Sequence, residues 1–290
     1  MTPLNNQKQL LGIILMVLAV FLFPLKDAIA KMTGGYYSAI VIMWAQMVFA
    51  SLFYVPIITI KYGPGILLPR KLFLQILRAI FVITGMCMFY WAISLVPLAE
   101  ATAISFVAPL VITAVSPFML GEKIGLRRWL AVVAGFIGVL IVLRPEFSGD
   151  RLGYMIAFGA GLSIGFFYLF NRLLADAAPP IANLTYSAII GTILLTPLIF
   201  SVWVPPRPED TLLIIGFVTF AAMGQTCLFS AFIYGEASIL APIAFSQIVG
   251  ATLFGYLFFG DFPDAVSIAG IAIVIASGIY IAIRETRQQE

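Results

Sequence analysis

Histidine is absent from this chain, and cysteine occurs only twice, at Cys87 and Cys227. Without imidazole the protein can form neither a Ser–His or Cys–His catalytic pair nor a histidine metal site. Both cysteines lie in the middle of apolar runs, where they are expected to pack as small hydrophobic side chains rather than to form a disulfide framework. Glycine-rich phosphate loops are missing too. These absences predict a protein that is not an enzyme, with no catalytic residues, no metal site and no cofactor.

Charged residues are scarce as well. Only 10% of the chain is Asp, Glu, Lys or Arg, whereas 62% is hydrophobic and the mean hydropathy is +1.09. A soluble domain carries about 25% charged residues because water must wet its surface. The net charge of +3 is too small and too scattered to predict a nucleic-acid partner. The sequence therefore predicts an integral membrane protein whose outer surface contacts the lipid bilayer.

Long apolar runs fill most of the chain. A membrane-spanning helix needs about 20 mostly apolar residues, and ten runs of roughly this length are separated by short polar or Pro/Gly breaks: 10–31, 36–60, 72–96, 98–120, 127–144, 152–174, 181–203, 211–234, 237–259 and 265–283. The first run ends in Ala28, Ile29 and Ala30, which imitate a signal-peptide cleavage site, but the internal repeat needs this segment, so we expect it to remain. We predict an all-α integral membrane protein with ten transmembrane helices.

The distribution of Lys and Arg predicts the orientation, because cytoplasmic loops carry an excess of these residues. If the N-terminus is inside, the cytoplasmic ends carry Lys8, Lys61, Arg70, Lys71, Lys123, Arg127, Arg128, Arg172, Arg284 and Arg287. The other side then has only Lys31, Arg144, Arg151 and Arg207. We therefore expect both termini in the cytoplasm.

The chain repeats itself. Residues 95–123 align with residues 234–262, and residues 10–24 align with residues 151–165, in the order of helices, glycines and acidic turns. Each copy holds five runs, an odd number, so the second copy must enter the membrane from the other side. Inverted repeats of this kind build a site near the middle of the bilayer that opens to either side in turn. We predict two inverted five-helix repeats, residues 1–145 and 146–290, around a central cavity.

Segments 97–145 and 237–281 resemble the EamA-type repeat of the drug/metabolite transporter superfamily. The residues that carry the resemblance are Pro109, Gly121-Glu122 and Arg127-Arg128-Trp129 in the first copy, and Pro242, Gln247 and Gly260-Asp261 in the second. The resemblance implies a ten-helix secondary carrier in a bacterial inner membrane that exports small metabolites, and it is closest to exporters of aromatic and other amino acids. A monomer would be sufficient for this activity, and the sequence leaves the oligomeric state open.

Lys26 and Asp27, near the end of the first run, allow two interpretations. In one, Asp27 pairs with Lys31 one turn later, and Lys26 extends to the outer lipid headgroups; adjacent helical residues point about 100° apart, so Lys26 and Asp27 are not expected to face each other. In the other, Pro24 breaks or bends the helix, and the Lys26 ammonium lies in the cavity and attracts a carboxylate of the substrate.

Further candidate substrate-binding residues share aromatic or uncharged polar side chains within predicted spans. They are Phe23, Tyr90, Trp91, Phe106, Phe167, Tyr168, Asn171, Gln225, Ser246 and Gln247, with Phe245 as the repeat partner of Phe106. The aromatic residues fit an interfacial belt or core packing equally well. Asn171 could be an interfacial anchor, and the amides could serve contacts between helices.

The remaining charged residues have structural interpretations. Glu100 and Glu236 precede helices and complement their dipoles, and Glu122 and Asp261 mark turns. Arg78 lies about two turns inside the third run, where it is a candidate gate or an anchor at the cytoplasmic surface. No acid stands in the middle of any predicted span, so the sequence indicates no coupling ion.

The function that we predict is a secondary carrier with alternating access, whose substrate is an amino acid with an aromatic or aliphatic side chain. A drug-like amphiphile is the alternative substrate, because the same aromatic residues would bind it. A passive channel would need a continuous polar pore. An intramembrane enzyme would need a catalytic constellation that the chain lacks.

Overall fold

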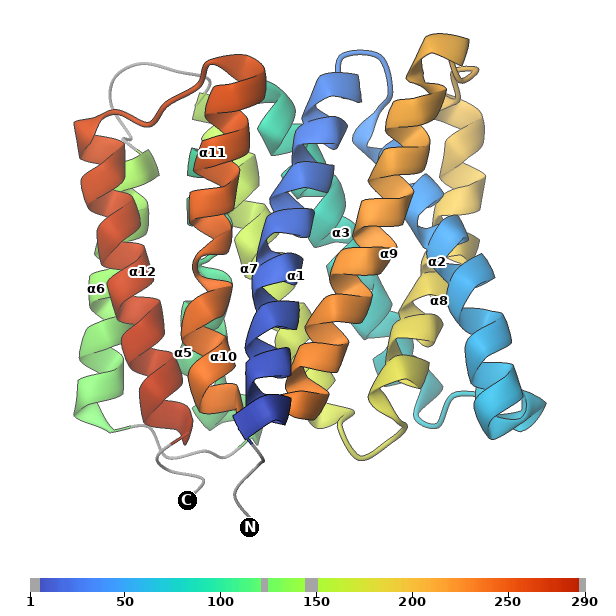
Figure 1. The fold of residues 1–290 in the computed structure, drawn as a ribbon, viewed down its shortest axis with the longest axis horizontal. Helices are drawn as coiled ribbons and strands as arrows, with labels where there is room; N and C mark the ends of the chain where they lie inside the picture. Colours follow the sequence, from blue (N-terminus) through green and yellow to red (C-terminus); the bar gives the residue numbers. More distant parts are fainter. Residues whose placement is uncertain (1–5, 121–124, 144–150, 287–290) are drawn as a thin grey trace.

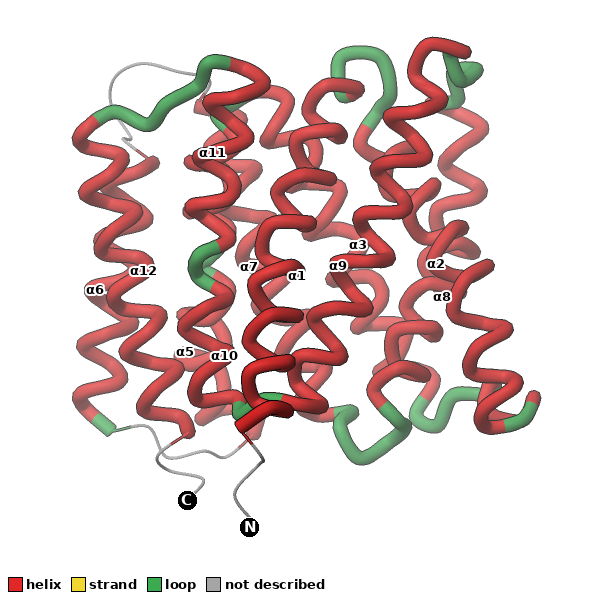
Figure 2. Tube along the Cα trace, in the orientation of Figure 1, coloured by secondary structure: helices red, strands yellow, loops and turns green. Residues whose placement is uncertain are grey.

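The computed structural model describes residues 6–120, 125–143 and 151–286, and every regular element in these ranges is a helix (Figures 1 and 2). The long helices are α1 (Asn6–Thr33), α2 (Ala39–Tyr62), α3 (Leu72–Leu95), α6 (Leu126–Leu143), α7 (Arg151–Leu173), α8 (Pro180–Val202), α9 (Thr211–Tyr234) and α12 (Ala265–Thr286). The shorter ones are α4 (Leu98–Ser105), α5 (Ala108–Leu120), α10 (Ala237–Ala244), α11 (Gln247–Phe259) and the 3-10 turns η1 (Pro64–Leu67) and η2 (Pro208–Asp210). The predicted turn at Glu122 and the orientation signals Lys123, Arg144 and Arg287 lie outside the described residues.

The helices account for ten membrane crossings. Eight segments are long and apolar enough to span a bilayer, and two further apolar helices, Trp129–Val142 and Ala265–Ile281, are shorter. The prediction of an all-α membrane protein is confirmed. Cys87 and Cys227 are free thiols.

Two of the crossings are broken, although the sequence predicted continuous helices over 98–120 and 237–259. At the first break, the backbone N–H groups of Phe106 and Val107 donate to carbonyls three residues earlier, and at the second those of Phe245 and Ser246 do the same. Pro109 favours the first break, because its ring would clash with the carbonyl of Ser105 in a continuous helix. At the second break, the Ser246 hydroxyl competes for the Ile243 carbonyl at 2.6 Å.

Pro24, in contrast, does not break α1, and that expectation was wrong. The helix continues through Pro24 to Thr33. Pro24 has no N–H to donate to the carbonyl of Val20, and Gly250 of α11 lies against this carbonyl: a Cβ at Gly250 would come within 3.1 Å of the Val20 oxygen and of the Pro24 ring. The close approach of a glycine, rather than a cavity, accommodates the proline.

The two halves pack against each other reciprocally. The first helix of one half lies beside the third helix of the other, as α1 with α9 and as α3 with α7, and the equivalent helices α2 and α8, and α6 and α12, also pair. Because the first half crosses five times, α7 starts at the face opposite to the start of α1. The repeats are therefore inverted.

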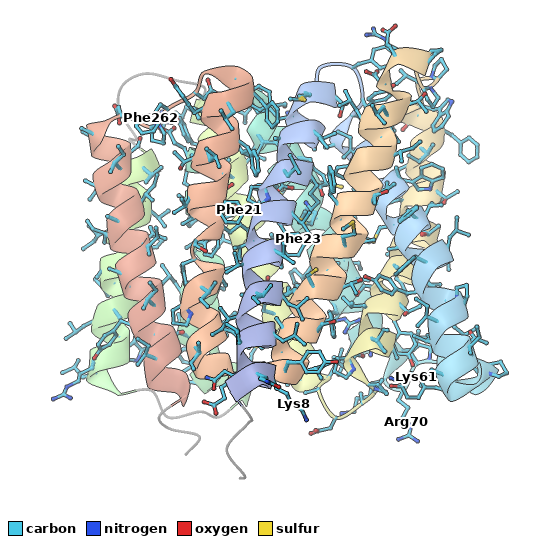
Figure 3. All side chains as sticks on the ribbon, in the orientation of Figure 1. Lys8, Phe21, Phe23, Lys61, Arg70 and Phe262 are labelled. Carbon is cyan, nitrogen blue, oxygen red and sulfur yellow. The ribbon has the colours of Figure 1, made fainter. Side chains whose placement is uncertain are left out.

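Both chain termini lie at one end of the helix bundle, which we call the terminal face; the other end is the opposite face (Figure 1). Lys8, Lys61 and Arg70 also lie at the terminal face (Figure 3). The assignment of the terminal face to the cytoplasm stays a prediction.

Candidate functional site

Lys26 and Asp27 form a buried ion pair in α1. Each residue is only 3% exposed, and the Lys26 ammonium donates directly to the Asp27 carboxylate. The expectation that these neighbours could not face each other was wrong, because the four-carbon stem of lysine is long enough to curl back along the helix. The proposal that Lys26 extends to the lipid headgroups is also excluded by its burial.

Three further helices, α2, α3 and α9, complete the surroundings of this pair. The Lys26 ammonium donates to the Tyr90 hydroxyl of α3 at 3.1 Å, and that hydroxyl donates to the Gln46 side-chain oxygen of α2. The ammonium lies 5.1 Å from the Tyr90 ring centroid and 5.9 Å from that of Phe217 of α9, within the range of cation–π attraction. We call these five residues, Lys26, Asp27, Tyr90, Gln46 and Phe217, the Lys26 cluster.

The Lys26 cluster lies within the membrane, nearer the opposite face. Lys26 precedes the end of α1 at Thr33 by seven residues, which is about 10 Å at the helical rise of about 1.5 Å per residue. The cluster draws residues from both halves, since Phe217 belongs to the second half. It lies where α1 packs against α9, one of the two reciprocal helix pairs.

Among the other candidate residues, Phe23 extends the Lys26 cluster. Its ring centroid lies 6.0 Å from the Lys26 ammonium. Phe106 and Phe245 meet at the two helix breaks, with ring centroids 5.0 Å apart. The Phe245 ring lies over Gly278 of α12, where a Cβ would come within 2.1 Å of it.

Several candidates lie away from the Lys26 cluster. Trp91 is 50% and Tyr168 is 45% exposed, as expected of interfacial aromatic residues. Phe167 packs on Tyr168 at 5.3 Å. Gln225 and Gln247 are half-buried, and the described residues provide no hydrogen bond to either side chain.

Asn171 belongs to a second buried polar group, centred on Arg78. The Arg78 guanidinium donates to the Asn171 side-chain oxygen at 3.2 Å, to the Ser187 hydroxyl at 2.9 Å and to the Asn183 carbonyl. Gln75 donates to the Asn183 side chain at 2.8 Å. We call these five residues the Arg78 cluster. Arg78 is 1% exposed, so the expectation that it reaches the membrane surface as an anchor was wrong.

A salt bridge between the halves closes the opposite face. Lys31 of α1 donates to the Asp261 carboxylate at 2.9 Å and to the Val96 carbonyl at 3.0 Å, and its ammonium lies 4.9 Å from the Phe259 ring centroid. The sequence predicted instead that Lys31 would pair with Asp27. Because Asp27 is already paired with Lys26, Lys31 is free to reach across to the second half.

Other contacts across the halves support this closure. The Tyr37 hydroxyl donates to the Asp210 carboxylate at 2.9 Å, and the Arg207 guanidinium lies 3.6 Å from the Tyr36 ring centroid. Burial raises the pKa of Tyr37 above its ordinary value, so the hydroxyl stays protonated and able to donate.

Glu100 accepts a hydrogen bond from Ser267 at 2.6 Å and another from Tyr154. These contacts go beyond the helix-dipole role that was predicted for Glu100.

The terminal face contains a hollow of about 600 Å³. It lies between η1 and the connection of α7 to α8 and is lined by Ile66, Arg70, Asp176, Pro179 and Tyr186, among others. The Tyr186 hydroxyl donates to the Ile66 carbonyl at 2.6 Å. The described part of the molecule therefore has an ion pair between the halves at the opposite face and a hollow at the terminal face.

Sequence reasoning missed Gln46, Gln75, Asn183, Ser187 and Phe217. The internal repeat holds a signal for Phe217, because Arg78 and Phe217 are each the seventh residue of equivalent 24-residue helices, α3 and α9. Among the described residues no group of three or more His, Cys, Asp or Glu side chains could hold a metal ion.

Comparison with known proteins agrees with this geometry. The model of the EamA-like transporter family matches residues 10–144 and again residues 151–283. The S-adenosylmethionine uptake transporter of Rickettsia prowazekii (strain Madrid E) is 25% identical over 279 residues, covering 95% of this chain and 94% of that protein. The pseudopaline exporter CntI of Pseudomonas aeruginosa (strain UCBPP-PA14) is 26% identical over 281 residues, covering 93% of this chain and 95% of that protein.

Two further relatives extend the comparison. The riboflavin transporter of Vibrio cholerae serotype O1 (strain ATCC 39315 / El Tor Inaba N16961) is 28% identical over 216 residues, covering 74% of this chain and 72% of that protein. A solved crystal structure shares the fold over 99% of both chains, with a TM-score of 0.64 and 17% identity. Because the two matches of the family model together span nearly the whole chain, this protein belongs to the EamA-like transporter family and is a multi-pass membrane transporter.

Proposed function

We propose that the Lys26 cluster binds the head group of a small zwitterionic solute, an amino acid or a metabolite that carries an amino-acid group. The observation that carries the proposal is the buried Lys26–Asp27 pair, which holds one positive and one negative charge and is surrounded by aromatic rings. Ionisable residues inside the membrane are expensive and mark substrate pathways.

A zwitterion is the ligand that this pair can accept without an unpaired charge. Its carboxylate would replace Asp27 at the Lys26 ammonium, and its ammonium would replace Lys26 at the Asp27 carboxylate. A solute with one charge would leave the other side chain buried and unpaired, which is strongly unfavourable. The Tyr90 hydroxyl can both accept and donate a hydrogen bond during this exchange of partners, since it already accepts from Lys26 and donates to Gln46.

The apolar part of the solute would pack on the surrounding rings. Tyr90 and Phe217 are in edge-to-face contact at 5.8 Å, and the Phe23 ring centroid lies 6.0 Å from the ammonium. Such rings favour an aromatic or aliphatic side chain. A drug-like amphiphile would use the rings alone and would not require the ion pair.

The named relatives fit this chemistry in part. The relative in Rickettsia prowazekii is named for the uptake of S-adenosylmethionine, a compound with an amino-acid group, and the one in Pseudomonas aeruginosa for the export of pseudopaline. Their names include both directions of transport, and export by this chain stays our prediction. The placement in a bacterial inner membrane, with cytoplasmic termini, is proposed as well.

Alternating access would follow from the two faces of the molecule. The Lys31–Asp261 bridge closes the opposite face, and the hollow opens at the terminal face. Rocking of α3 to α5 and of α9 to α11 against α1 and α7 would draw Asp261, which follows α11, away from Lys31 of α1, and would expose the Lys26 cluster to the other side. Inverted repeats provide two such arrangements of similar energy.

Counterflow in liposomes tests this function. Purified protein is reconstituted, the liposomes are preloaded with one unlabelled amino acid, and uptake of the same labelled compound is followed across a panel that includes L-phenylalanine and L-leucine. We expect preloading to accelerate uptake in wild type, and Lys26→Met and Asp27→Asn to abolish it. Lys61→Met is the control, because Lys61 is exposed at the terminal face.

Uptake that Lys26→Met leaves unchanged would contradict the proposed site. Transport of hydrophobic cations but of no amino acid would favour the amphiphile exporter. Uptake that never responds to preloading would favour a channel.

A further inference from the structure

Arg78 is a buried cation without a counter-ion. Its three hydrogen-bond acceptors, on Asn171, Asn183 and Ser187, are all uncharged, and no carboxylate of the described residues lies within ion-pair distance of it. Lys26, the other deeply buried cation, has Asp27 beside it. An unpaired buried charge is costly to fold, so the Arg78 cluster is short of one negative charge.

Two polar atoms of the Arg78 cluster also have no partner among the described residues. They are the Nε of Arg78, a donor, and the Oε1 of Gln75, an acceptor. Gln75 is fully buried and Arg78 nearly so. Buried polar atoms are nearly always hydrogen-bonded, and exceptions call for an explanation such as an absent ligand. A guanidinium with one free N–H suits an oxyanion.

The Arg78 cluster lies next to the hollow at the terminal face. Tyr186, which lines the hollow, is followed directly in α8 by Ser187, which contacts Arg78. Arg70 lies in the wall of the hollow as well. Asp176 is the acidic residue of that wall. Rotation of Tyr186, with loss of its hydrogen bond to the Ile66 carbonyl, would connect the hollow to Arg78.

The internal repeat relates the two cations. Arg78 of α3 is equivalent to Phe217 of α9, and Lys26 of α1 is equivalent to Phe167 of α7. Among the described residues, each reciprocal helix pair, α1 with α9 and α3 with α7, therefore holds one deeply buried cation. Lys26 lies nearer the opposite face and Arg78 nearer the terminal face.

We propose that Arg78 is a second carboxylate-binding site, entered from the hollow at the terminal face, where the carboxylate of the solute binds before or after it occupies the Lys26 cluster. The identity of that carboxylate rests on the proposed function; the anion site itself rests on the missing counter-ion. Asn171 and Ser187 hold the guanidinium in place, and the free Nε donates to the bound oxyanion. Transport then proceeds between two cations, one for each face.

The key variant is Asn171→Asp. The aspartate side chain has nearly the same shape as asparagine and keeps an oxygen that accepts from Arg78. It also supplies the missing negative charge from within the protein. The probe is 3-phenylpropionate, which has a carboxylate and no ammonium; its binding to purified protein in nanodiscs of zwitterionic lipid is measured by calorimetry. Phenethylamine, which has the ammonium alone, is the control ligand. Ser187→Ala, which removes an acceptor without adding charge, is the control variant.

We expect 3-phenylpropionate, and not phenethylamine, to bind wild type and Lys26→Met. Asn171→Asp should weaken this binding at least tenfold and raise the melting temperature of the ligand-free protein, whereas Ser187→Ala should weaken it less than threefold. Binding lost in Lys26→Met but retained in Asn171→Asp would overturn the proposal. Equal displacement of the probe by inorganic phosphate would overturn its restriction to carboxylates.

The measurement separates this proposal from the proposed function. Binding of 3-phenylpropionate that depends on Asn171, in a protein that shows no amino-acid counterflow, would keep the anion site and reject the zwitterionic substrate. Amino-acid counterflow with no effect of Asn171→Asp on either transport or probe binding would keep the zwitterionic substrate and reject the anion site at Arg78.

Discussion

At the scale of single residues, the buried Lys26–Asp27 pair is the main electrostatic feature of the transporter's first half. Lys26 and Asp27 share a site from which water is excluded, and each needs the other more for charge balance than for packing. Removal of one partner of a buried pair destabilises a protein by about 3–5 kcal/mol, whereas replacement of both by apolar residues is often neutral. The pair therefore adds little net stability, as expected of residues that we propose bind the substrate.

The variant Asp27→Leu tests this balance. It leaves the Lys26 charge buried and unpaired, so we expect a loss of about 3 kcal/mol in the free energy of unfolding, measured by thermal unfolding in detergent. The double variant Lys26→Met with Asp27→Leu should recover most of that stability and still fail to transport. A double variant no more stable than Asp27→Leu alone would contradict the expectation.

Tyr90→Phe isolates one hydroxyl of the Lys26 cluster. The change keeps the ring over the ammonium and removes the hydrogen bonds to Lys26 and Gln46. A hydrogen bond to a charged group is worth about 1.5–3 kcal/mol, so we expect counterflow of the substrate to fall about tenfold or more with little change in folding. Tyr280→Phe, at an exposed position of α12, is the matched control. An unaltered rate in Tyr90→Phe would remove this hydroxyl from the site.

At the scale of residues, the sequence was a better guide to candidate residues than to the contacts between them. Lys26, Phe23 and Tyr90, which stood out as candidates because ionisable and aromatic residues are conspicuous in an apolar run, lie together in the structure. Gln46 and Asn183 were missed because a single amide gives no indication of its partner until the helices are placed. The partner of Lys31 is Asp261, in the other half. Rules based on short sequence spacings cannot predict a contact between residues so far apart in the chain.

At the scale of helices, the two broken crossings are the main departure from regular structure. Each break leaves backbone groups outside the helical pattern in the membrane, which is tolerated only where protein covers them. The Phe106 and Phe245 rings cover the breaks and contact each other at 5.0 Å. The two halves therefore contact each other at their least regular points, and we expect the breaks to act as hinges between the segments on either side.

Pro109→Ala tests the role of the first break. The new N–H can donate to the Ser105 carbonyl, so α4 and α5 should form one continuous helix, more stable by about 1 kcal/mol. We expect a higher melting temperature together with slower counterflow, because the hinge is lost. Pro117→Ala, later in α5, is the control proline. A variant that transports at the normal rate would show that the break is not needed.

The ten apolar runs were predictable because the thickness of the bilayer fixes helix length, and their ends agree with the structure within a few residues. The helix breaks were not predictable, because a proline in an apolar run can either interrupt the helix or be accommodated within it. Pro24 is absorbed in α1 against Gly250, whereas Pro109 follows a break. The difference lies in the neighbouring helix, and the sequence does not reveal neighbours.

At the scale of the whole molecule, the Lys31–Asp261 bridge sets which face is closed. The pair is partly exposed, so it contributes about 1 kcal/mol, enough to change a balance between two states about fivefold. We expect Lys31→Ala to increase the population that is open at the opposite face. The measurement is the distance distribution between spin labels at Ser94 and Phe262, both exposed there, in a background with Cys87 and Cys227 replaced.

The exchanged pair, Lys31→Asp with Asp261→Lys, serves as the control for this prediction. It should restore the wild-type distance distribution, because the charges attract in either order. Lys61→Ala, at the terminal face, should have no effect. An unchanged distribution in Lys31→Ala would show that the remaining contacts, such as that of Tyr37 with Asp210, close this face without the bridge.

The reciprocal packing of α1 with α9 and of α3 with α7 has a consequence for biosynthesis. While the ribosome is still producing the second half, α1 is already in the bilayer without its principal neighbour, and the Lys26 charge is covered only by Asp27 and the residues of α2 and α3. The nascent first half must therefore wait, associated but incomplete, until α9 is inserted. Coexpression of the two halves as separate polypeptides, cut between α6 and α7, should still yield assembled transporter, whereas either half alone should be degraded by membrane proteases.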